Sequence, residues 1–258
     1  MSNGFLRRLR SGSLELISPL VVLIVWQILA KTNAIDTRFW PAPTDIISQL
    51  WDGLFHGSLA HDTWLTTVRL VIGLAIGGVA GLIAGLAMGL WRPARLALRP
   101  LIAMTYPIPK IAILPLFLVL FGIGETSKWM LVAVGVFYMV AINTLAGINT
   151  IESVLDETAT VYRISWWRRI RTVTIPGAMP LIITGLELGI GVGFLLVVAA
   201  EFVSSQSGLG YAIWQAWQTF NVPLMYAALA VVAIYGILIQ LLSRWLNRRL
   251  VGWRSQAD

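Results

Sequence analysis

The chain has 258 residues, a net charge of +7 and no cysteine, and only 12% of its residues are charged. Soluble domains carry roughly 25% charged residues, so this composition, with a mean hydropathy of +0.78, is typical of an integral membrane protein and excludes an ordinary soluble one. Without cysteine, disulfides and thiolate metal sites are excluded as well.

Six apolar runs are long enough to cross the membrane as helices, since a hydrocarbon core of about 30 Å needs about 20 residues. They cover residues 14–32, 68–90, 100–121, 129–148, 179–202 and 225–245. No convincing cleavage site follows the first run, which is therefore expected to remain as a span. Lone strands would leave backbone groups unpaired in lipid, so we expect an all-α fold with 1–258 forming one transmembrane domain.

The distribution of Lys and Arg predicts the orientation of the spans. If the N-terminus is inside, the outer segments hold only Lys31, Arg38 and Lys128, and Arg69 and Lys110 fall at or within spans. All other basic residues then lie in cytoplasmic segments, which predicts that both termini are cytoplasmic. Topology alone then explains the net positive charge, so no nucleic-acid partner is expected.

The first outer segment is expected to contain a short helix at the membrane interface, capped by Thr44 or Asp45. Its apolar face would carry Ile46, Ile47, Leu50, Trp51, Leu54 and Phe55. His56 and His61 follow, but two histidines at this spacing do not make a metal site, so we expect them to be solvent-exposed.

The second candidate span has a glycine at every fourth position: Gly73, Gly77, Gly81, Gly85 and Gly89. Glycine at this period forms a groove that admits another helix closely. Two alternatives are open, packing within the chain, which we favour, and contact with a second copy.

The third candidate span cannot be one regular helix, because Pro107, Pro109 and Pro115 each remove a backbone donor and clash one turn back. Broken backbone at membrane depth is tolerated where it is buried in protein or lines a cavity, so this span is expected to adjoin a pathway through the membrane. Lys110 would either extend to the interface or face the cavity.

A long polar segment, residues 152–180, separates the fourth and fifth candidate spans and carries Arg163, Arg168, Arg169 and Arg171. Residues 156–173 lack Gly and Pro, so a helix can form there. A structured basic loop of this length is more than a connection, and we expect it to meet a soluble cytoplasmic partner.

Part of this segment resembles the coupling loop of ABC importer permeases, whose motif reads E-A-A, three residues, G, then I-x-L-P after nine or more. Glu157 and Ala159 match, Thr158 replaces an alanine, and Arg163 stands at the place of the glycine. The resemblance covers Asp156, Glu157, Thr158, Ala159, Arg163, Ile175 and Pro176. It implies that the loop 152–177 docks in a groove of a cytoplasmic ATPase.

Further motifs resemble the permease branch that serves nitrate, sulfonates, taurine and bicarbonate. They are Pro107-x-Pro109, Pro115-Leu116, the run 121–128, Pro180, Thr184-Gly185-Leu186, Ala199-Ala200-Glu201 and Gly208-Leu209-Gly210. The resemblance implies a type I importer permease in the bacterial cytoplasmic (inner) membrane. It also implies a second copy of the chain, two ATPase subunits and an extracytoplasmic solute-binding protein as partners.

Two acidic residues fall in or at the end of the fifth candidate span. Glu187 lies inside it, where a charge is costly, so it should face the bundle, pair or be protonated; the branch usually has a basic residue there. Glu201 closes the span on the outer side. It is either a gate at the outer mouth of the translocation path or a carboxylate that is hydrogen-bonded within the bundle.

Catalytic signatures are absent from the sequence. It contains no G-x-x-x-x-G-K-[ST] motif and no catalytic or metal-ligand constellation, so we expect a non-enzymatic transport subunit with no cofactor, whose partner binds ATP and Mg²⁺. The main hypothesis is the permease of an ATP-driven importer of a small solute. The alternative is a self-contained secondary transporter driven by an ion gradient.

Overall fold

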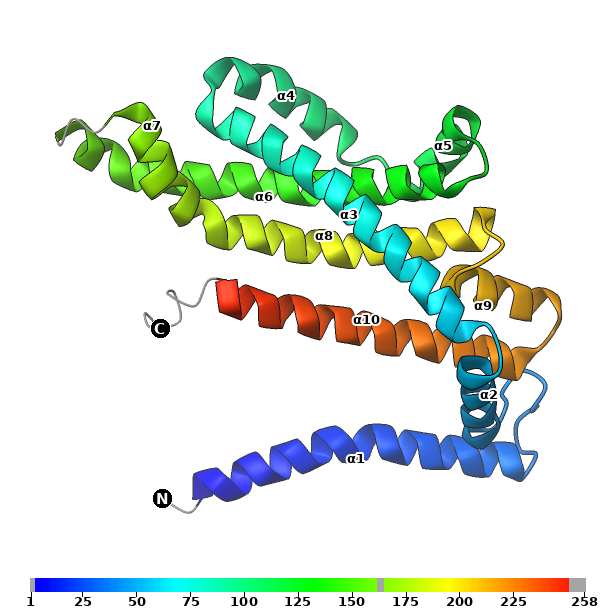
Figure 1. The fold of residues 1–258 in the computed structure, drawn as a ribbon. Coiled ribbons are helices and arrows are strands. Elements are labelled where there is room, and N and C mark those ends of the chain that lie inside the picture. Colours follow the sequence, from blue (N-terminus) through cyan, green and yellow to red (C-terminus); the bar gives the residue numbers. More distant parts are fainter. Residues whose placement is uncertain (1–2, 162–164, 251–258) are drawn as a thin grey trace. The chain divides into compact units, whose positions relative to one another are not determined.

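The computed structural model describes the backbone of residues 3–161 and 165–250, and the side chains of residues 17–150, 165–245, 247 and 249. All regular secondary structure within these residues is helical, and turns and short loops connect the helices (Figure 1). The elements are α1 (Asn3–Lys31), α2 (Pro43–Phe55), α3 (Leu59–Leu90), α4 (Arg92–Thr105), η1 (Lys110–Ile113), α5 (Leu114–Phe121), α6 (Glu125–Val161), α7 (Trp166–Arg169), η2 (Ile170–Thr174), α8 (Ile175–Ser204), α9 (Leu209–Gln218) and α10 (Val222–Leu250).

Four helical stretches are long and apolar enough to cross a membrane, as predicted. They are Leu59–Leu90, Glu125–Thr150, Trp166–Ser204 and Val222–Trp245. A fifth, the pair α4 and η1–α5, meets the same test only as a broken span bent by 95°. The first predicted span corresponds to α1, whose described apolar part, Ile17–Lys31, is shorter than a full crossing.

The chain contacts divide the molecule into two compact units. The first comprises residues 1–60 and 212–231, and the second comprises residues 61–211 and 232–258. The larger, second unit holds the three helices α3, α6 and α8 that position the candidate site.

In the first unit, α2 begins differently from the prediction that Thr44 or Asp45 would cap it. Its N-cap is Ala42, with an extended backbone and no side-chain cap, because Pro43 supplies the first helical turn. Thr44 is instead held by α1, since its backbone N–H donates to Oε1 of Gln27 at 3.1 Å. Ile46 is buried, whereas Ile47 and other residues of the apolar face remain exposed, as an interfacial helix requires.

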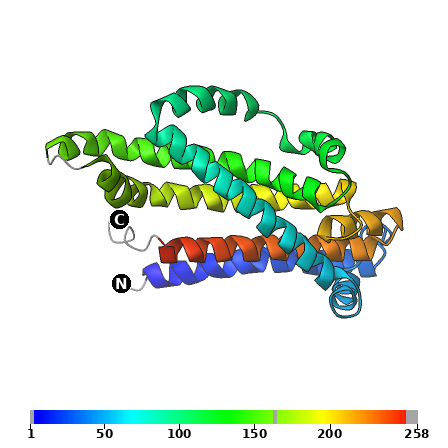
Figure 2. The ribbon, with the colours of Figure 1, turned by 45° about the horizontal axis from the view of Figure 1, so that its top comes forward.

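In the second unit, α6 and α8 lie side by side along most of their length, and α3 crosses them (Figures 1 and 2). The glycines of α3 make that crossing close: a Cβ at each of the five would overlap the backbone or a side chain of α6. At Gly77 it would overlap the carbonyl group of Ala133. The glycine groove is thus occupied by a helix of the same chain, which is the first of the two alternatives.

The third predicted span is broken where its prolines fall. Pro107 and Pro109 lie between α4 and η1, and Pro115 lies in the first turn of α5, where a missing N–H is harmless. The position of Lys110 on a translocation path stays a prediction, but its contacts are clear. Its ammonium donates to the carbonyl oxygens of Thr105, Tyr106 and Ile108 at 3.1, 2.8 and 2.8 Å, and thus caps the broken end of α4.

The polar segment 152–180 is mostly helical rather than a loop. α6 continues to Val161, and a second helical run starts at Trp166 and passes through the π-helical turn η2 into α8. One helix over 156–173 does not form, because Ser165, the N-cap of α7, has an extended backbone with a ψ of 142°. The segment is therefore the meeting point of two long helices.

Replacing Gly77 by Ala is expected to lower the thermal midpoint of the detergent-solubilised protein. The added methyl group overlaps the α6 backbone, and overpacking of this kind costs typically about 1–3 kcal/mol. Gly191→Ala on α8 is the matched control, because its Cβ would meet no atom within 4 Å. Alanine is also the better helix former, so the control midpoint should hold or rise, and equal losses in both variants would contradict the close crossing.

Candidate functional site

A buried arginine joins three helices at one end of the second unit. Arg69 lies in the third turn of α3, and its side chain is only 3% exposed. Its Nη1 donates to Oε1 of Glu201, near the end of α8, at 2.7 Å. On its other edge, Nε and Nη2 donate to the two oxygens of Glu125, the first residue of α6, at 2.6 and 2.8 Å. One guanidinium thus ties α3, α6 and α8 together.

Glu201 is fully buried and fully paired. Besides Arg69, its carboxylate accepts hydrogen bonds from the Thr66 hydroxyl, 2.9 Å from both oxygens, and from the backbone N–H of Gly210 at 3.1 Å. A buried carboxylate is tolerated only when it is both charge-paired and hydrogen-bonded, and Glu201 meets both conditions. Glu201 is thus a carboxylate that is hydrogen-bonded within the bundle, and a role as a gate stays a prediction.

The turn between α8 and α9 is held by the same residues. Arg69 donates to the carbonyl oxygen and the hydroxyl of Ser207, each at 2.8 Å. The N–H of Gly208 donates to Asp62 at 2.7 Å, and that of Leu209 donates to Thr66 at 3.0 Å. Gly208 has a φ of +103°, and any side chain there would overlap Glu201 and Arg69, so only glycine fits. We call these residues the outer lock: Asp62, Thr66, Arg69, Glu125, Glu201, Ser207, Gly208 and Gly210.

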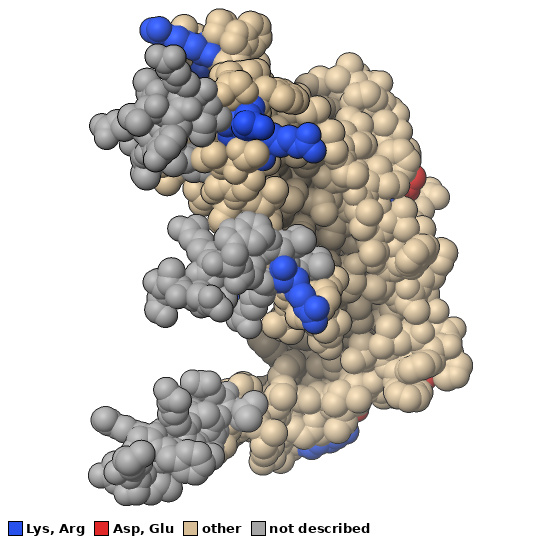
Figure 3. Space-filling model, turned by 60° about the vertical axis from the view of Figure 1, so that its left-hand side comes forward, with Lys and Arg blue, Asp and Glu red and all other residues tan. Residues whose placement is uncertain are grey.

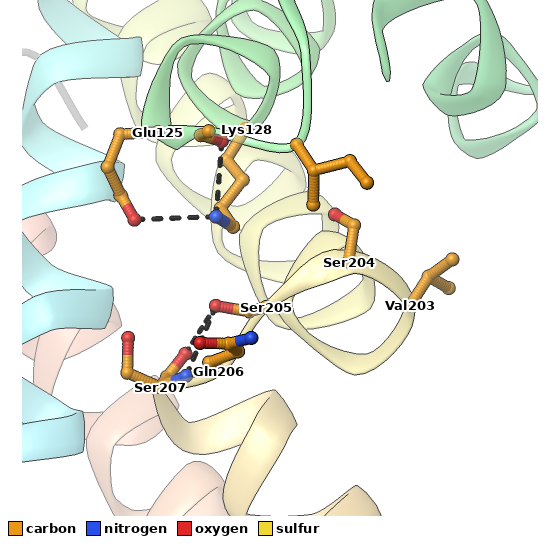
Figure 4. Close-up of a pocket in the computed structure, with 9 residues that line it drawn as sticks. Glu125, Lys128, Val203, Ser204, Ser205, Gln206 and Ser207 are labelled. Carbon is orange, nitrogen blue, oxygen red and sulfur yellow. Dashed lines mark hydrogen bonds and ion pairs between the residues drawn. The ribbon is translucent and has the colours of Figure 1, made fainter.

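A polar cavity of about 560 Å³ opens beside the outer lock. It is lined by residues 123–125 and Lys128 on one side and by residues 203–207 on the other (Figure 4). Lys128 reaches it with a side chain that is only 4% exposed, and its ammonium donates to the carbonyl oxygen of Gly124 at 3.1 Å and to Glu125 at 3.3 Å. The sequence placed Lys128 in an outer segment, and its burial beside Glu125 was not anticipated.

Glu187 is separate from the outer lock. It is half-buried on α8 and faces α10, where Asn247 donates to its carboxylate at 3.1 Å and Arg244 lies 3.7 Å away. The expectation that this carboxylate would pair is met by a basic residue near the C-terminal end of α10. Glu187, Lys110 and Glu201 therefore have different partners in the structure, and their place on a translocation path stays a prediction.

The residues expected to dock an ATPase lie where α6 and α8 end and begin. Asp156, Glu157, Thr158 and Ala159 fall in the last turns of α6, whose side chains are outside the described residues, and Arg163 is outside them altogether. Ile175 and Pro176 begin α8 directly after the π-helical turn. The role of these residues stays a prediction.

Basic side chains gather at this end of the second unit, opposite the outer lock (Figure 3). Those that are exposed include Arg92 and Arg99 on α4, Arg168 and Arg171 at the start of the α7–α8 run, and Arg244 on α10. Clustering of basic residues at one end of the spans is the pattern expected of the cytoplasmic side.

Reasoning from the sequence missed the centre of the outer lock. Arg69 was noted only as falling at the edge of a span, and Asp62, Thr66 and Ser207 were not singled out. A signal was present, since an arginine inside a predicted span needs a carboxylate partner and Glu201 is at the same end of another span.

Comparison with known proteins places these features among transport permeases. A family model described as "Binding-protein-dependent transport system inner membrane component" matches residues 77–252. The taurine transport system permease protein TauC of Escherichia coli is 33% identical over 96% of this chain and 92% of its own length. The putative aliphatic sulfonates transport permease protein SsuC of Bacillus subtilis is 32% identical over 94% of this chain and 88% of its own.

A solved structure shares the fold. It is the MetNI methionine ABC transporter in an inward-facing conformation, with a TM-score of 0.67 and 21% identity over 77% of this chain and 98% of the matched chain.

Arg69→Met is expected to destabilise the protein strongly, because it leaves Glu201 buried without a counter-charge, and breaking such a pair costs about 3–5 kcal/mol. Glu125→Gln should cost about 1 kcal/mol or less, since Glu125 is half exposed and Arg69 keeps Glu201. The double variant Arg69→Met/Glu201→Met should recover part of the stability lost in Arg69→Met.

Thermal unfolding in detergent, followed by tryptophan fluorescence, checks this order of stabilities. A double variant less stable than the sum of its single losses would contradict the pairing.

Proposed function

Because the chain belongs to the family of binding-protein-dependent transport system inner membrane components, we propose that it is the permease of an ATP-driven importer for small sulfonates or taurine-like solutes. The family and the apolar helices make it a multi-pass protein of the inner membrane and a transport subunit. The single observation that carries the substrate class is the 32–33% identity, over nearly the whole chain, to permeases named for aliphatic sulfonates and taurine.

The proposed complex contains two copies of this chain, two cytoplasmic ATPases and an extracytoplasmic solute-binding protein. ATP and Mg²⁺ would be bound by the ATPase, since the permease sequence has no phosphate-binding loop and we assign no catalysis to it. The docking element would be the segment 152–177, with Glu157 at its surface.

The long helix α6 is suited to carry motion between the two ends of the permease. It runs without a break for 37 residues, about 55 Å at 1.5 Å per residue, while the hydrocarbon core is about 30 Å thick. Its first residue, Glu125, is held by Arg69 in the outer lock, and its last turns contain the proposed docking residues. Closure of the ATPases would therefore move α6 as a rod and switch access between the two sides.

The same argument applies to α8, which starts within the docking segment at Ile175 and carries Glu201 near its other end. The close glycine contacts between α3 and α6 support movement of α3 and α6 as one body, because closely packed helices do not slide past each other easily. The outer lock is then the point at which the moving helices are joined on the outer side.

Affinity purification of the tagged chain from its own membranes is expected to recover a nucleotide-binding ATPase in equimolar amount. Glu157→Arg should lose it, because the substitution reverses the charge at the proposed docking surface. Asp52→Arg on α2, an exposed residue predicted to be outside, is the matched control and should retain the ATPase, as should Arg163→Gly, which restores the family's glycine. Retention by Glu157→Arg would remove this residue from the docking surface.

Proteoliposomes that contain the permease, its ATPase and the binding protein are expected to accumulate radiolabelled taurine only when ATP is supplied. An imposed proton or sodium gradient without ATP should give no uptake. Uptake by the chain alone, driven by an ion gradient, would instead establish the secondary transporter.

A further inference from the structure

We propose that the polar cavity beside the outer lock is an outer binding site for a small zwitterion. Its anionic head would lie against Lys128, Gln206 and Ser207, and its ammonium group would lie against Glu125. The proposal rests on the proposed function and narrows its substrate class, small sulfonates or taurine-like solutes, to solutes that carry both a positive and a negative charge.

Lys128 supplies an unused charged donor to the cavity. An ammonium group has three N–H bonds, and the described residues provide two acceptors, the carbonyl oxygen of Gly124 and the carboxylate of Glu125. The third N–H is left for a ligand. Because the lysine side chain is almost fully buried, its charge is poorly screened by water and a hydrogen bond to it is strong.

Two further donors line the opposite wall of the cavity. The Ser207 hydroxyl oxygen accepts from Arg69, which leaves its own hydrogen without an acceptor among the described residues. The Gln206 amide is exposed and makes no hydrogen bond within the described part of the chain. Ser204 and Ser205, by contrast, already donate to the backbone, to Ala200 and Ser207. The free groups in the cavity are therefore mainly hydrogen-bond donors. An oxyanion such as a sulfonate or a carboxylate would accept hydrogen bonds from them.

The charge of the site selects a zwitterion over a simple anion. Contacts run from Glu201 through Arg69 and Glu125 to Lys128, so each of these two cations has a carboxylate partner, and Asp62 of the outer lock adds a further negative charge. An added anion would be unpaired, and an added cation would face Lys128. A zwitterion adds no net charge to the site, and its ammonium would lie at the carboxylate of Glu125, which is 47% exposed and borders the cavity. The cavity volume of about 560 Å³ holds such a solute with its water.

Ligand binding to the full-length chain in lipid nanodiscs tests the proposal, with saturation-transfer NMR as the readout. The probes are 2-aminoethanesulfonate, ethanesulfonate, which lacks the ammonium group, and ethylamine, which lacks the sulfonate. We expect the zwitterion to bind at least about tenfold more tightly than either single-charge probe, the effect of losing one charge-assisted hydrogen bond. Equal affinities for the zwitterion and ethanesulfonate would overturn the proposal.

Val203→Trp places the measurement at this cavity without touching the outer lock. Val203 lines the cavity and is 66% exposed, so a larger side chain can fill the space without overlapping the core. It should weaken binding of 2-aminoethanesulfonate by about tenfold. Val119→Trp, at an exposed position on α5, is the matched control and should leave binding unchanged. Undiminished binding in Val203→Trp would show that the ligand sits elsewhere.

Lys128→Met should abolish the preference for the zwitterion over ethanesulfonate. If Lys128→Met does not fold, the Val203→Trp measurement tests the site in its place. Binding in nanodiscs requires neither ATP nor a partner. Loss of ATP-driven uptake would therefore overturn the proposed function while this site stands, and failure of the binding test would overturn the site while uptake stands.

Discussion

The pairing of one arginine with two carboxylates is the interaction on which the outer end of this permease depends. Arg69 satisfies Glu201 inside the bundle, Glu125 at the start of α6 and the turn that follows α8. In a low-dielectric interior each of these groups would be costly alone, so the guanidinium fixes the relative positions of three helices at once. The unusual backbone at Gly208 and the close approach of Gly210 follow from the need to bring the turn against Glu201.

The opposite end of the same helices has no comparable buried ionic network among the described residues. There the described residues include several exposed arginines, and the helical run that leads into α8 begins after a break at Ser165. A rigid middle, packed through glycine contacts between α3 and α6, connects the two ends. This division suits a permease. Motion of a partner at the accessible inner end would move α6 and α8, and the joined outer end would move with them.

Local patterns in the sequence predicted what is determined locally. Hydrophobic run length located four spans and the broken third one, the four-residue glycine period located a close helix crossing, and Pro107 and Pro109 located the break. The pairing of Arg69 with Glu201 was missed because it joins residues 132 positions apart, and no local period encodes such a contact. The predicted N-cap of α2 was wrong because Pro43 can begin a helix without a side-chain cap. The contacts of Lys110 were missed because they depend on carbonyl groups that only the bend frees.

The spacing of the arginine and its partners along the chain also has a consequence for membrane insertion. Synthesis proceeds from the N-terminus, so Arg69 enters the bilayer region with α3 before Glu125, 56 residues later, and well before Glu201, 132 residues later. Until those helices arrive, its guanidinium can be solvated only by reaching toward the nearby aqueous surface. The position of Arg69 close to the helix end therefore lets α3 insert alone, and the ionic contacts then form in the order in which α6 and α8 are made.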